Sequence, residues 1–594
     1  MGQRHQVFLI ARVAAHNAAD TAARYRCVGA YHHQWCYGRL PLIAARRFIT
    51  LVKQKDNAEI IREQLQSIQG KYGLGKTEPH MPAIPCPYPT FLVSSAFCID
   101  LEAGHAYGSG VSFQNSVLDA NMGSGDGDNN DGITVFDITD PTNPAYCFVC
   151  VGGLEGEVAV GGWTPLTAEQ YVRAYYPVPN EKQKEREGVK ETEEDVQKRI
   201  DALSGERLMT LDMLAEAWPH EYSAAPNPTK DTAASNSSTA VPSLADLTLR
   251  PAVEHAIKVG ETEELEGLVW MPGKADHMKS VLRSQVSFPD SGLSLLAKVL
   301  EHEAGSTSNT IDLSGLALSD SQIHSLLPST GADKIELLNL SHNPNFTVDI
   351  LRTALTLYPK LRRLVLLSTA ISDEQIHQLL VDEPKLFYSI EELVHPAFLS
   401  WQNDVCYPVS FAYVGIHGYG VPSSACLATF TPASVVQSLT DLLSPLAELG
   451  EYEMYGLLGT SLAPQVAFAS GVRGEGESWQ DRRVHCFPAF NNAPFSGKGW
   501  LFVGQWETMS QSGCRYGFVQ TDLEPDPPRA TIYDLAGFLK EMAAEGRPPA
   551  AESAVNKLEK IFVDLEQRQE AKLWTEPEFV TFTGKFTMYN MRRY

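Results

Sequence analysis

Two stretches of ten residues near the middle of the chain are almost the same. "LSDSQIHSLL" at 318–327 and "ISDEQIHQLL" at 371–380 agree at seven of ten positions and lie 53 residues apart. The apolar positions Ile311, Leu338 and Leu364 follow one another at steps of 27 and 26 residues, each with a leucine two residues later. A period of this length indicates a small supersecondary unit that buries its apolar edge only against the next unit.

Each unit also has an internal pattern. The segments 335–343 ("IELLNLSHN") and 361–369 ("LRRLVLLST") share the spacing Leu-x-x-Leu-x-Leu-x-x-Asn, with substitutions at the outer places. This pattern resembles the leucine-rich repeat of ribonuclease-inhibitor type, over about 265–400. The resemblance implies a short strand and then a helix in each unit, stacked as a solenoid. The segments 264–273 and 389–398 look like degraded units before and after the array.

One face of the predicted strands is a candidate binding surface. Residues that alternate with the buried leucines point to the opposite face, because side chains alternate along a strand. Stacked repeats use such extended faces to bind other proteins, so we predict that this face binds a protein partner. The alternative is that the flanking domains of the same chain cover it. The residues concerned are Asp312, Asn339, Arg363 and Val365.

The regions on either side of the repeats are typical of α+β domains. Strand-like segments rich in β-branched and aromatic residues stand among helix-like segments with apolar residues three and four apart. Before the repeats come a helix with charges of alternating sign and a stretch rich in Pro, Ser and Thr, which favours a disordered linker. We therefore predict a short α/β solenoid between two α+β domains. The expected boundaries are 1–178, 179–245 for the charged helix and linker, 246–400 for the repeats, and 401–594.

Charge and cysteine usage narrow the classes of partner and compartment. The formal net charge of −24 disfavours nucleic acid as a partner, because phosphates repel such a chain. The chain has no apolar run of about 18 residues, so the sequence predicts no membrane span. Ten scattered cysteines and no convincing secretory signal favour a cytoplasmic protein. "MGQRHQ", "YHHQWCYG" and "DNNDGITVFDITD" resemble uncharacterised fungal intracellular proteins, a resemblance that implies no function.

The segment "HHQWC" offers a candidate catalytic group in the N-terminal region. A thiolate beside a histidine can act as a nucleophile, which places Cys36 with His32 or His33. Such a pair would make the domain a hydrolase or a transferase. The alternative is a partly buried surface at the end of a strand.

The segment "DGDNNDGITVFD", 126–137, is dense in the oxygen ligands that calcium prefers. It departs from a calcium-binding loop because its central glycine is replaced by Asp131 and its last ligand is an aspartate. The alternative is a polar surface loop with Asx turns. The candidate ligands are Asp126, Asp128, Asn130, Thr134 and Asp137.

Two further motifs have the wrong surroundings. "GKYGLGKT", 70–77, fits a phosphate-binding loop, but a helix-like segment precedes it and closely spaced prolines follow it. We interpret Gly70 or Gly73 as a helix stop. His417 and Ser461 lie in segments similar to those of subtilisin-like proteases. Their separation is too short for the intervening sheet, and the aspartate motif is missing.

The prediction of function depends on the repeats. They predict an intracellular interaction or scaffold protein that uses the strand face. The first alternative is an enzyme with the Cys36 site, and the second is a structural, self-assembling protein. The sequence predicts no cofactor beyond the calcium candidate.

Overall fold

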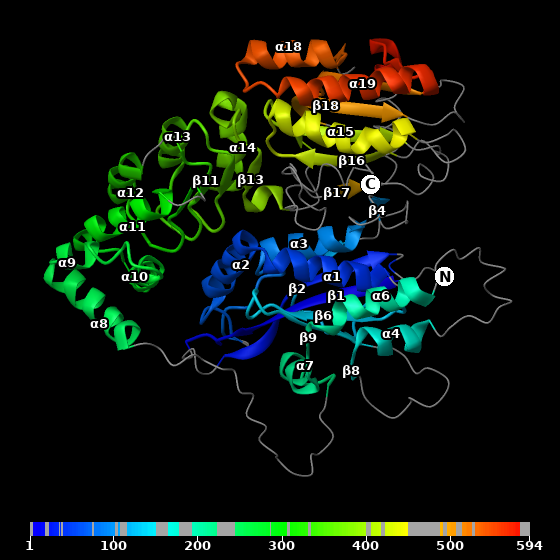
Figure 1. Ribbon diagram of the computed structural model, residues 1–594. Coiled ribbons are helices and arrows are strands. Elements are labelled where there is room, and N and C mark those ends of the chain that lie inside the picture. Colours follow the sequence, from blue (N-terminus) through cyan, green and yellow to red (C-terminus); the bar gives the residue numbers. More distant parts are fainter. Residues whose placement is uncertain are drawn as a thin grey trace.

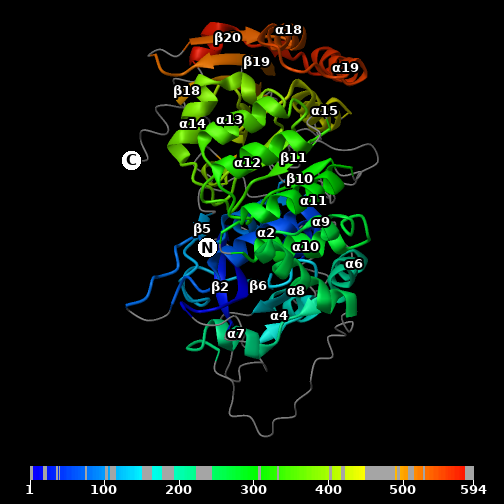
Figure 2. The same cartoon turned by 90° about the vertical axis from the view of Figure 1, so that its left-hand side faces the viewer.

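The computed structural model shows a mixed α and β protein with an N-terminal domain, a central array and a C-terminal domain (Figure 1). The array, drawn in green, lies along one side of both domains. Turned by 90°, the molecule still shows the N-terminal domain at one end and the C-terminal helices α18 and α19 at the other (Figure 2). The structure describes residues 4–17, 23–34, 36, 38, 40–73, 77–100, 105–106, 116–149, 164–176, 193–222, 244–285, 287–305, 309–330, 334–399, 405–416, 422–448, 488–490, 496–505, 514–525 and 529–581.

The N-terminal domain is built on a mixed sheet of order β5-β2-β1-β6-β7-β8, with β9 paired to β7 beside this path. β1 is antiparallel to β2 and parallel to β6, and β6 is antiparallel to β7. The central strands are apolar on both faces because both faces of the sheet are covered. The strands are β1 (Arg4–Val13), β2 (Arg24–Gln34), β5 (Ser116–Leu118), β6 (Ile133–Asp137), β7 (Ala145–Val149), β8 (Pro165–Leu166) and β9 (Arg207–Leu208), with a separate pair β3 (Ile99–Asp100) and β4 (His105–Ala106).

Helices cover this sheet unequally. On one face, the ring of Phe136 from β6 lies 4.6 Å from the ring of Phe48 and 6.3 Å from that of Phe97, measured between centroids. On the other face, Trp218 packs edge-on against Phe8 at 5.4 Å. The first face holds α1 (Leu40–Lys53), α2 (Lys55–Ile68), α3 (Pro87–Cys98), α4 (Ala168–Tyr175) and α6 (Glu193–Ser204), and the second holds α7 (Leu211–Ala217).

The N-terminal domain extends to Tyr222, so the predicted boundary at 178 is wrong. Leu203 at the end of the charged helix α6 is fully buried, β9 continues the sheet, and Trp218 is 7% exposed. A mostly charged helix still docks when it has one apolar edge, which is why the alternation of charges was misleading. The predicted linker at 223–243 lies outside the described residues.

The central array consists of four short parallel strands in one sheet, with helices between them. The predicted apolar positions Ile311, Leu338 and Leu364 stand side by side in register, and Leu393 continues the row. All three predicted positions are fully buried. The strands are β10 (Thr310–Asp312), β11 (Leu337–Asn339), β12 (Arg363–Val365) and β13 (Glu392–Val394), and the connections carry α12 (Asp320–Leu326), η4 (Leu327–Thr330), α13 (Val348–Leu357), α14 (Asp373–Asp382) and η5 (Pro384–Phe387), with η6 (Pro396–Phe398) after β13.

The two matching ten-residue stretches begin helices in the same way. Ser319 and Gln322 form a capping box at the start of α12, and Ser372 and Gln375 form one at the start of α14. Each box satisfies two backbone amides that a helix start leaves unpaired. The repeated sequence is therefore a repeated helix start.

Asn343 holds neighbouring units of the array together. Its buried side-chain amide donates hydrogen bonds to the carbonyl of Leu313 at 2.8 Å and to that of Leu340 at 3.0 Å. These carbonyls belong to consecutive units. The asparagine of the sequence pattern thus satisfies backbone groups that would otherwise be buried without a partner.

The predictions for the two ends of the array differ in outcome. The segment 389–398 contains β13, which pairs with β12 as a fourth parallel strand. The segment 264–273 is not a strand unit but a helical turn followed by further turns, and Gly273, at φ +72°, precedes the next helix. This end of the array carries α8 (Leu244–Val259), α9 (Glu263–Glu266), α10 (Lys274–Arg283), η3 (Asp290–Gly292) and α11 (Leu293–Gly305).

The C-terminal domain has a sheet of order β17-β16-β15-β18-β19-β20, with β14 on β18 and β21 on β19. One face packs against helices through Phe502, Phe518 and Phe538, and the rings of the last two stack at 4.3 Å. The elements are β14 (Val405–Cys406), β15 (Phe411–Ile416), β16 (Pro422–Leu427), α15 (Pro432–Glu448), β17 (Pro488–Phe490), β18 (Ser496–Gln505), β19 (Arg515–Asp522), β20 (Arg529–Tyr533), α18 (Leu535–Glu545), α19 (Glu552–Gln569) and β21 (Lys572–Leu573).

The two flanking domains share one sheet topology. In each, a first strand pairs antiparallel with the second and parallel with a later one, which forms an antiparallel pair with the next strand. In each, a final two-residue strand then runs parallel to that last strand. These final strands begin "RLMT" at 207–210 and "KLWT" at 572–575. Met209 and Trp574 donate their amides to the carbonyls of Tyr146 and Tyr516, at 2.9 and 3.0 Å.

Among the helices in the described part of the chain, none has the length and apolar character needed to cross a membrane.

Candidate interaction surface

The predicted binding residues lie in two rows across the array. The strand register places Asp312, Asn339 and Val365 side by side, and Arg363 belongs to the neighbouring row with Glu392. We call this surface the strand face. It points away from the leucines that the helices of the array cover, as the alternation of the sequence predicts.

The strand face is closed by the N-terminal domain of the same chain. Asn339 is 6% exposed, Arg363 is 3% exposed and Val365 is 1% exposed. Val365 belongs to an apolar cluster that also includes core residues of the flanking domains. In this structure the strand face is not open to solvent: the N-terminal domain covers it, which is the alternative stated above.

Helix α2 provides most of the polar contacts. The Arg363 guanidinium lies 3.0 Å from the Asp56 carboxylate, and it donates a hydrogen bond to the hydroxyl of Tyr88 on α3 at 3.3 Å. The Asn339 amide donates to both carboxylate oxygens of Glu63, at 3.1 and 3.2 Å. Ser314 after β10 donates its hydroxyl to the same carboxylate.

The spacing of these acids matches the spacing of the strands. Asp56 and Glu63 are seven residues apart, which is two helical turns and about 10.5 Å along the axis. Asp56 contacts β12, and Glu63 contacts β11 and Ser314 after β10. Neighbouring strands lie about 4.8 Å apart, so two helical turns span the distance from β12 to β10. With Glu59 between them, these acids form one stripe on α2 that runs across the strands.

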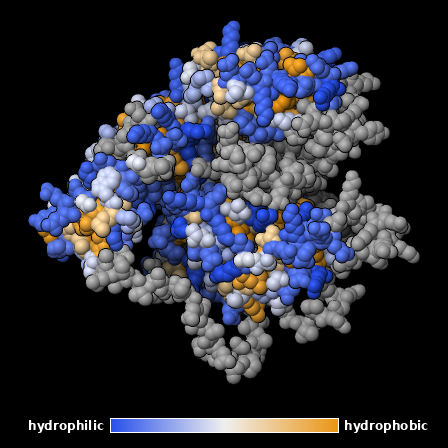
Figure 3. Space-filling model, in the orientation of Figure 1, coloured by the Kyte–Doolittle hydropathy of each residue, from blue (hydrophilic) through white to orange (hydrophobic). Residues whose placement is uncertain are grey.

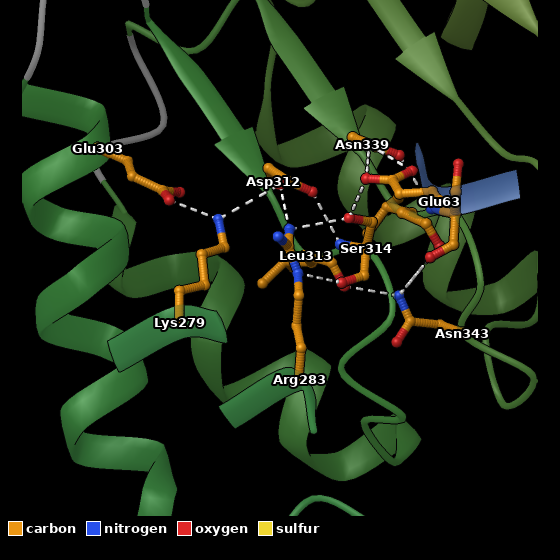
Figure 4. A network of polar contacts seen from close by, with 11 residues as sticks. Glu63, Lys279, Arg283, Glu303, Asp312, Leu313, Ser314, Asn339 and Asn343 are labelled. Atoms are coloured by element: carbon orange, nitrogen blue, oxygen red, sulfur yellow. Dashed lines mark hydrogen bonds and ion pairs between the residues drawn. The ribbon is translucent and has the colours of Figure 1, made fainter. Parts of the chain in front are cut away.

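A second group of charges supports this contact from within the array (Figure 4). Lys279 of α10 lies 2.5 Å from the Glu303 carboxylate on α11 and 3.6 Å from that of Asp312 on β10. Arg283 pairs with Asp312 and donates to the carbonyl of Ser314 at 2.9 Å. Asp312, the fourth predicted binding residue, is thus held by two cations of its own region.

The electrostatics of the two central acids differ. Burial would raise the pKa of Asp312, but Lys279 and Arg283 outweigh burial and lower that pKa below its usual range. Burial, and then the charge of Asp312, raise the pKa of Glu63 to about 8. Glu63 is therefore largely protonated at neutral pH, and only Asp312 is firmly ionised.

Arg363 sits between two carboxylates. Burial alone would lower the pKa of its guanidinium, but Glu392, Tyr88 and Asp56 raise it. The ion pair with Glu392 on β13 spans 3.0 Å. Because burial of an unpaired charge is costly, this arginine requires both its own array and α2 as partners.

The array also docks on the C-terminal domain, at its last unit. The guanidinium of Arg547 lies over the rings of Tyr388 and Phe430, at 4.3 and 4.1 Å from their centroids. It donates to the carbonyl of Phe430 at 3.2 Å. Thr431 donates its hydroxyl to Glu391 of the array at 2.9 Å. The array therefore bridges the two flanking domains.

The predicted Cys36 site has no access for a substrate. Cys36 is fully buried and His33 is 1% exposed. Burial lowers the pKa of His33 to about 3 and lowers that of His32 as well, so neither ring is charged at neutral pH. A reactive thiolate needs some exposure and a cationic neighbour. The described residues around Cys36 do not provide this combination.

The predicted calcium ligands are used within the N-terminal domain. Asp128 and Asp137 each pair with an arginine guanidinium, and the other three candidate ligands form hydrogen bonds within the domain. In the described part of the chain, no group of three or more His, Cys, Asp or Glu could hold a metal ion. The pairs are Asp126 with the Gly123 amide, Asp128 with the Arg4 guanidinium, Asn130 with the Arg4 amide, Thr134 with His5, and Asp137 with Arg207.

Of the other motifs, one contains a helix end, and the remaining residues lie outside the described part of the chain. Gly70 has φ of +66° directly after α2, which confirms the interpretation of a helix stop. Residues 74–76 of the phosphate-loop pattern lie outside the described residues, as do His417 and Ser461.

Sequence reasoning missed α2 as the occupant of the strand face. Its acids Asp56, Glu59 and Glu63 at spacings of three and four are the only local signal, and such a stripe is also typical of a solvated helix face.

No protein-family model, no curated protein and no solved structure matches this chain.

Proposed function

We propose that this chain is a protein-interaction scaffold. Its central array is a short leucine-rich-repeat solenoid of ribonuclease-inhibitor type that binds α2 of its own N-terminal domain in cis. Three observations support the repeat assignment: the regular steps between successive strands, the rows of buried leucines, and the hydrogen bonds of Asn343. The pairing of the strand face with acids of α2 carries the functional proposal.

The contact combines polar recognition with an apolar cluster that is shared with the flanking domains. Arg363 and Asn339 meet two acids with defined geometry, while Val365 supplies apolar contact beside them. Charged and polar groups fix register and exclude wrong partners more than they add affinity. The face is thus a helix-binding surface, and an acidic helix is the ligand that it selects.

A cis ligand holds the domains in one arrangement. A tethered helix acts at a local concentration on the order of millimolar, so it excludes weak competitors without high intrinsic affinity. The array fixes the N-terminal domain through its strand face and the C-terminal domain through its last unit. Scaffolding in this sense means setting the relative position of two domains.

A peptide experiment on the full-length chain tests helix recognition. In one variant, Asp56→Lys and Glu63→Lys weaken the cis helix. The probe is a fluorescein-labelled, helix-stabilised peptide with the sequence of residues 55–68, followed by fluorescence anisotropy. We expect binding to this opened variant, much weaker binding to the wild type, and loss of binding when Arg363→Glu is added.

The matched control is the same peptide with lysine in place of its two contact acids. Equal binding of both peptides, or binding unaffected by Arg363→Glu, would show that the strand face does not recognise the acidic stripe. The Cys36 enzyme hypothesis receives no support from the described geometry, and we do not propose it.

A further inference from the structure

The end of the array that precedes β10 exposes an unusual amount of apolar surface. In the described part of the chain, four of the large apolar side chains that are most exposed lie within 259–271, whereas the others are spread over the rest of the molecule. Figure 3 shows apolar side chains gathered at this end, where α8, α9 and α10 lie. The four are Val259 at 52% exposed, Leu268 at 38%, Trp270 at 55% and Met271 at 50%. We call this surface the Trp270 patch.

Packing within the domain does not account for these residues. Leu265 and Val269, from the same segment, are buried and close the core of α8 to α11. Trp270 meets His302 edge-on at 5.3 Å, which orients the ring but leaves more than half of the residue in solvent. Tryptophan and methionine are enriched at protein interfaces, where a rigid ring and a flexible thioether fill a partner's surface.

Exposed acidic residues lie close to the patch in the sequence. Glu261, Glu263 and Glu264 are exposed in the same segment, and Asp276 is exposed on α10. Between 258 and 276 the sequence has five acids and two lysines, Lys258 and Lys274. An apolar centre with a negative rim has the form of a docking site in which the rim selects partners by charge.

We propose that the Trp270 patch binds a basic amphipathic helix of another protein. Its apolar face would cover Trp270 and Met271, and its lysines or arginines would meet the glutamates of the rim. A second copy of this chain is disfavoured, because a two-fold contact would place the two acidic rims against each other. This surface is separate from the strand face, so a partner can bind here while α2 stays docked.

The probe is a labelled amphipathic helical peptide of about 18 residues, with leucines on one face and lysines on the other. Anisotropy titrations with the full-length chain compare it with a peptide of equal leucine content that has glutamate in place of lysine. We expect the lysine peptide to bind and the glutamate peptide not to bind. Trp270→Ser with Met271→Ser should weaken binding by about tenfold or more.

Matched controls separate this site from general attraction to an acidic protein. Val381→Ser removes a side chain on α14 that is also 50% exposed and should leave the affinity unchanged. Glu261→Lys, Glu263→Lys and Glu264→Lys should weaken binding more than the same change at Glu552, Glu559 and Glu570, which are exposed on or beside α19.

Three results would overturn the proposal. The first is a lysine peptide that binds the Trp270→Ser, Met271→Ser variant as tightly as the wild type. The second is equal weakening by the two glutamate triplets, which would mean non-specific attraction. The third is concentration-dependent dimerisation in light scattering that Trp270→Ser abolishes, which would identify a second copy as the occupant.

Discussion

The N-terminal and C-terminal domains have the same sheet topology, yet they meet the array in different ways. The N-terminal domain uses the side of α2, with acids that pair with Arg363 and Asn339. The C-terminal domain uses Arg547, whose guanidinium lies over the ring of Tyr388 at the last unit. In the described part of the C-terminal crossover, α15 lies between β16 and β18, and α2 has no counterpart there. The helices added to the shared sheet therefore determine which surface of each domain contacts the array.

The two contacts should respond differently to salt and pH. One ion pair, between Arg363 and Asp56, and the Glu63 carboxylate with its raised pKa form the charged part of the N-terminal contact. Across the C-terminal contact, Arg547 makes a cation–π contact with Tyr388 of the array, and Thr431 donates a hydrogen bond to Glu391. The first three substitutions below, at Arg363, Arg547 and Glu63, each alter one of these two contacts.

Loss of the Arg363 side chain should have the largest effect. Arg363→Ala leaves Asp56 and Glu392 next to each other in a buried contact without their cation, so we expect a loss of about 3–5 kcal/mol in unfolding free energy. Denaturant unfolding followed by circular dichroism measures it. Arg352→Ala is the control, because its pairs with Asp349 and Glu383 lie on the surface and their loss should change the unfolding free energy little.

Arg547→Ala should cost less, about 2–3 kcal/mol. It removes two cation–π contacts and the ion pair with Glu545, and it leaves the carbonyls of Phe430 and Pro408 without this donor. The cost should depend on salt less than that of Arg363→Ala, because Arg547 has one carboxylate partner and Arg363 has two. Equal salt dependence of the two variants would contradict the proposed difference between the contacts.

The pH dependence of the N-terminal contact follows from Glu63. Its pKa is raised in the folded state, so its contribution is fully present below its unfolded pKa and is lost as the pH rises towards about 8. Between pH 5 and 8, wild-type stability should fall relative to Glu63→Gln, by at most about 1.4 kcal/mol per pH unit. Parallel stability curves for the two proteins would show that Glu63 does not titrate in this way.

Trp270→Ser should have the smallest effect on stability, within about 0.5 kcal/mol, because the side chain is 55% exposed. Thermal unfolding of the variant checks this expectation. A large loss would mean that the Trp270 patch is part of the core, and its role as a docking site would then lose its basis.

The period of the array could be predicted from the sequence because each unit repeats a local pattern. Ile311, Leu338 and Leu364 are required by stacking, so their spacing is visible without any knowledge of the flanking domains. The direction in which Asn339 and Arg363 point also follows from strand alternation. What covers them depends on α2, which lies about 300 residues earlier, and no local rule reports such a contact.

The shared topology of the flanking domains was not visible in the sequence for a related reason. The matching signal is confined to short segments, such as Tyr146-x-Phe148-Val149 and Tyr516-x-Phe518-Val519. A strand pairing pattern can be kept with few identical residues, because any apolar side chain of suitable size fills the core. The candidate Cys36 and calcium sites failed because residue types alone do not show whether a group is exposed or already paired.

A double-mutant cycle between Asp56 and Arg363 tests the central claim most directly. These residues are 307 positions apart, so an energetic coupling between them requires that α2 and the strand face touch. Unfolding free energies of the wild type, Asp56→Ala, Arg363→Ala and the double variant should give a coupling of about 1–3 kcal/mol. Effects that add to within about 0.5 kcal/mol would show that the strand face does not hold α2.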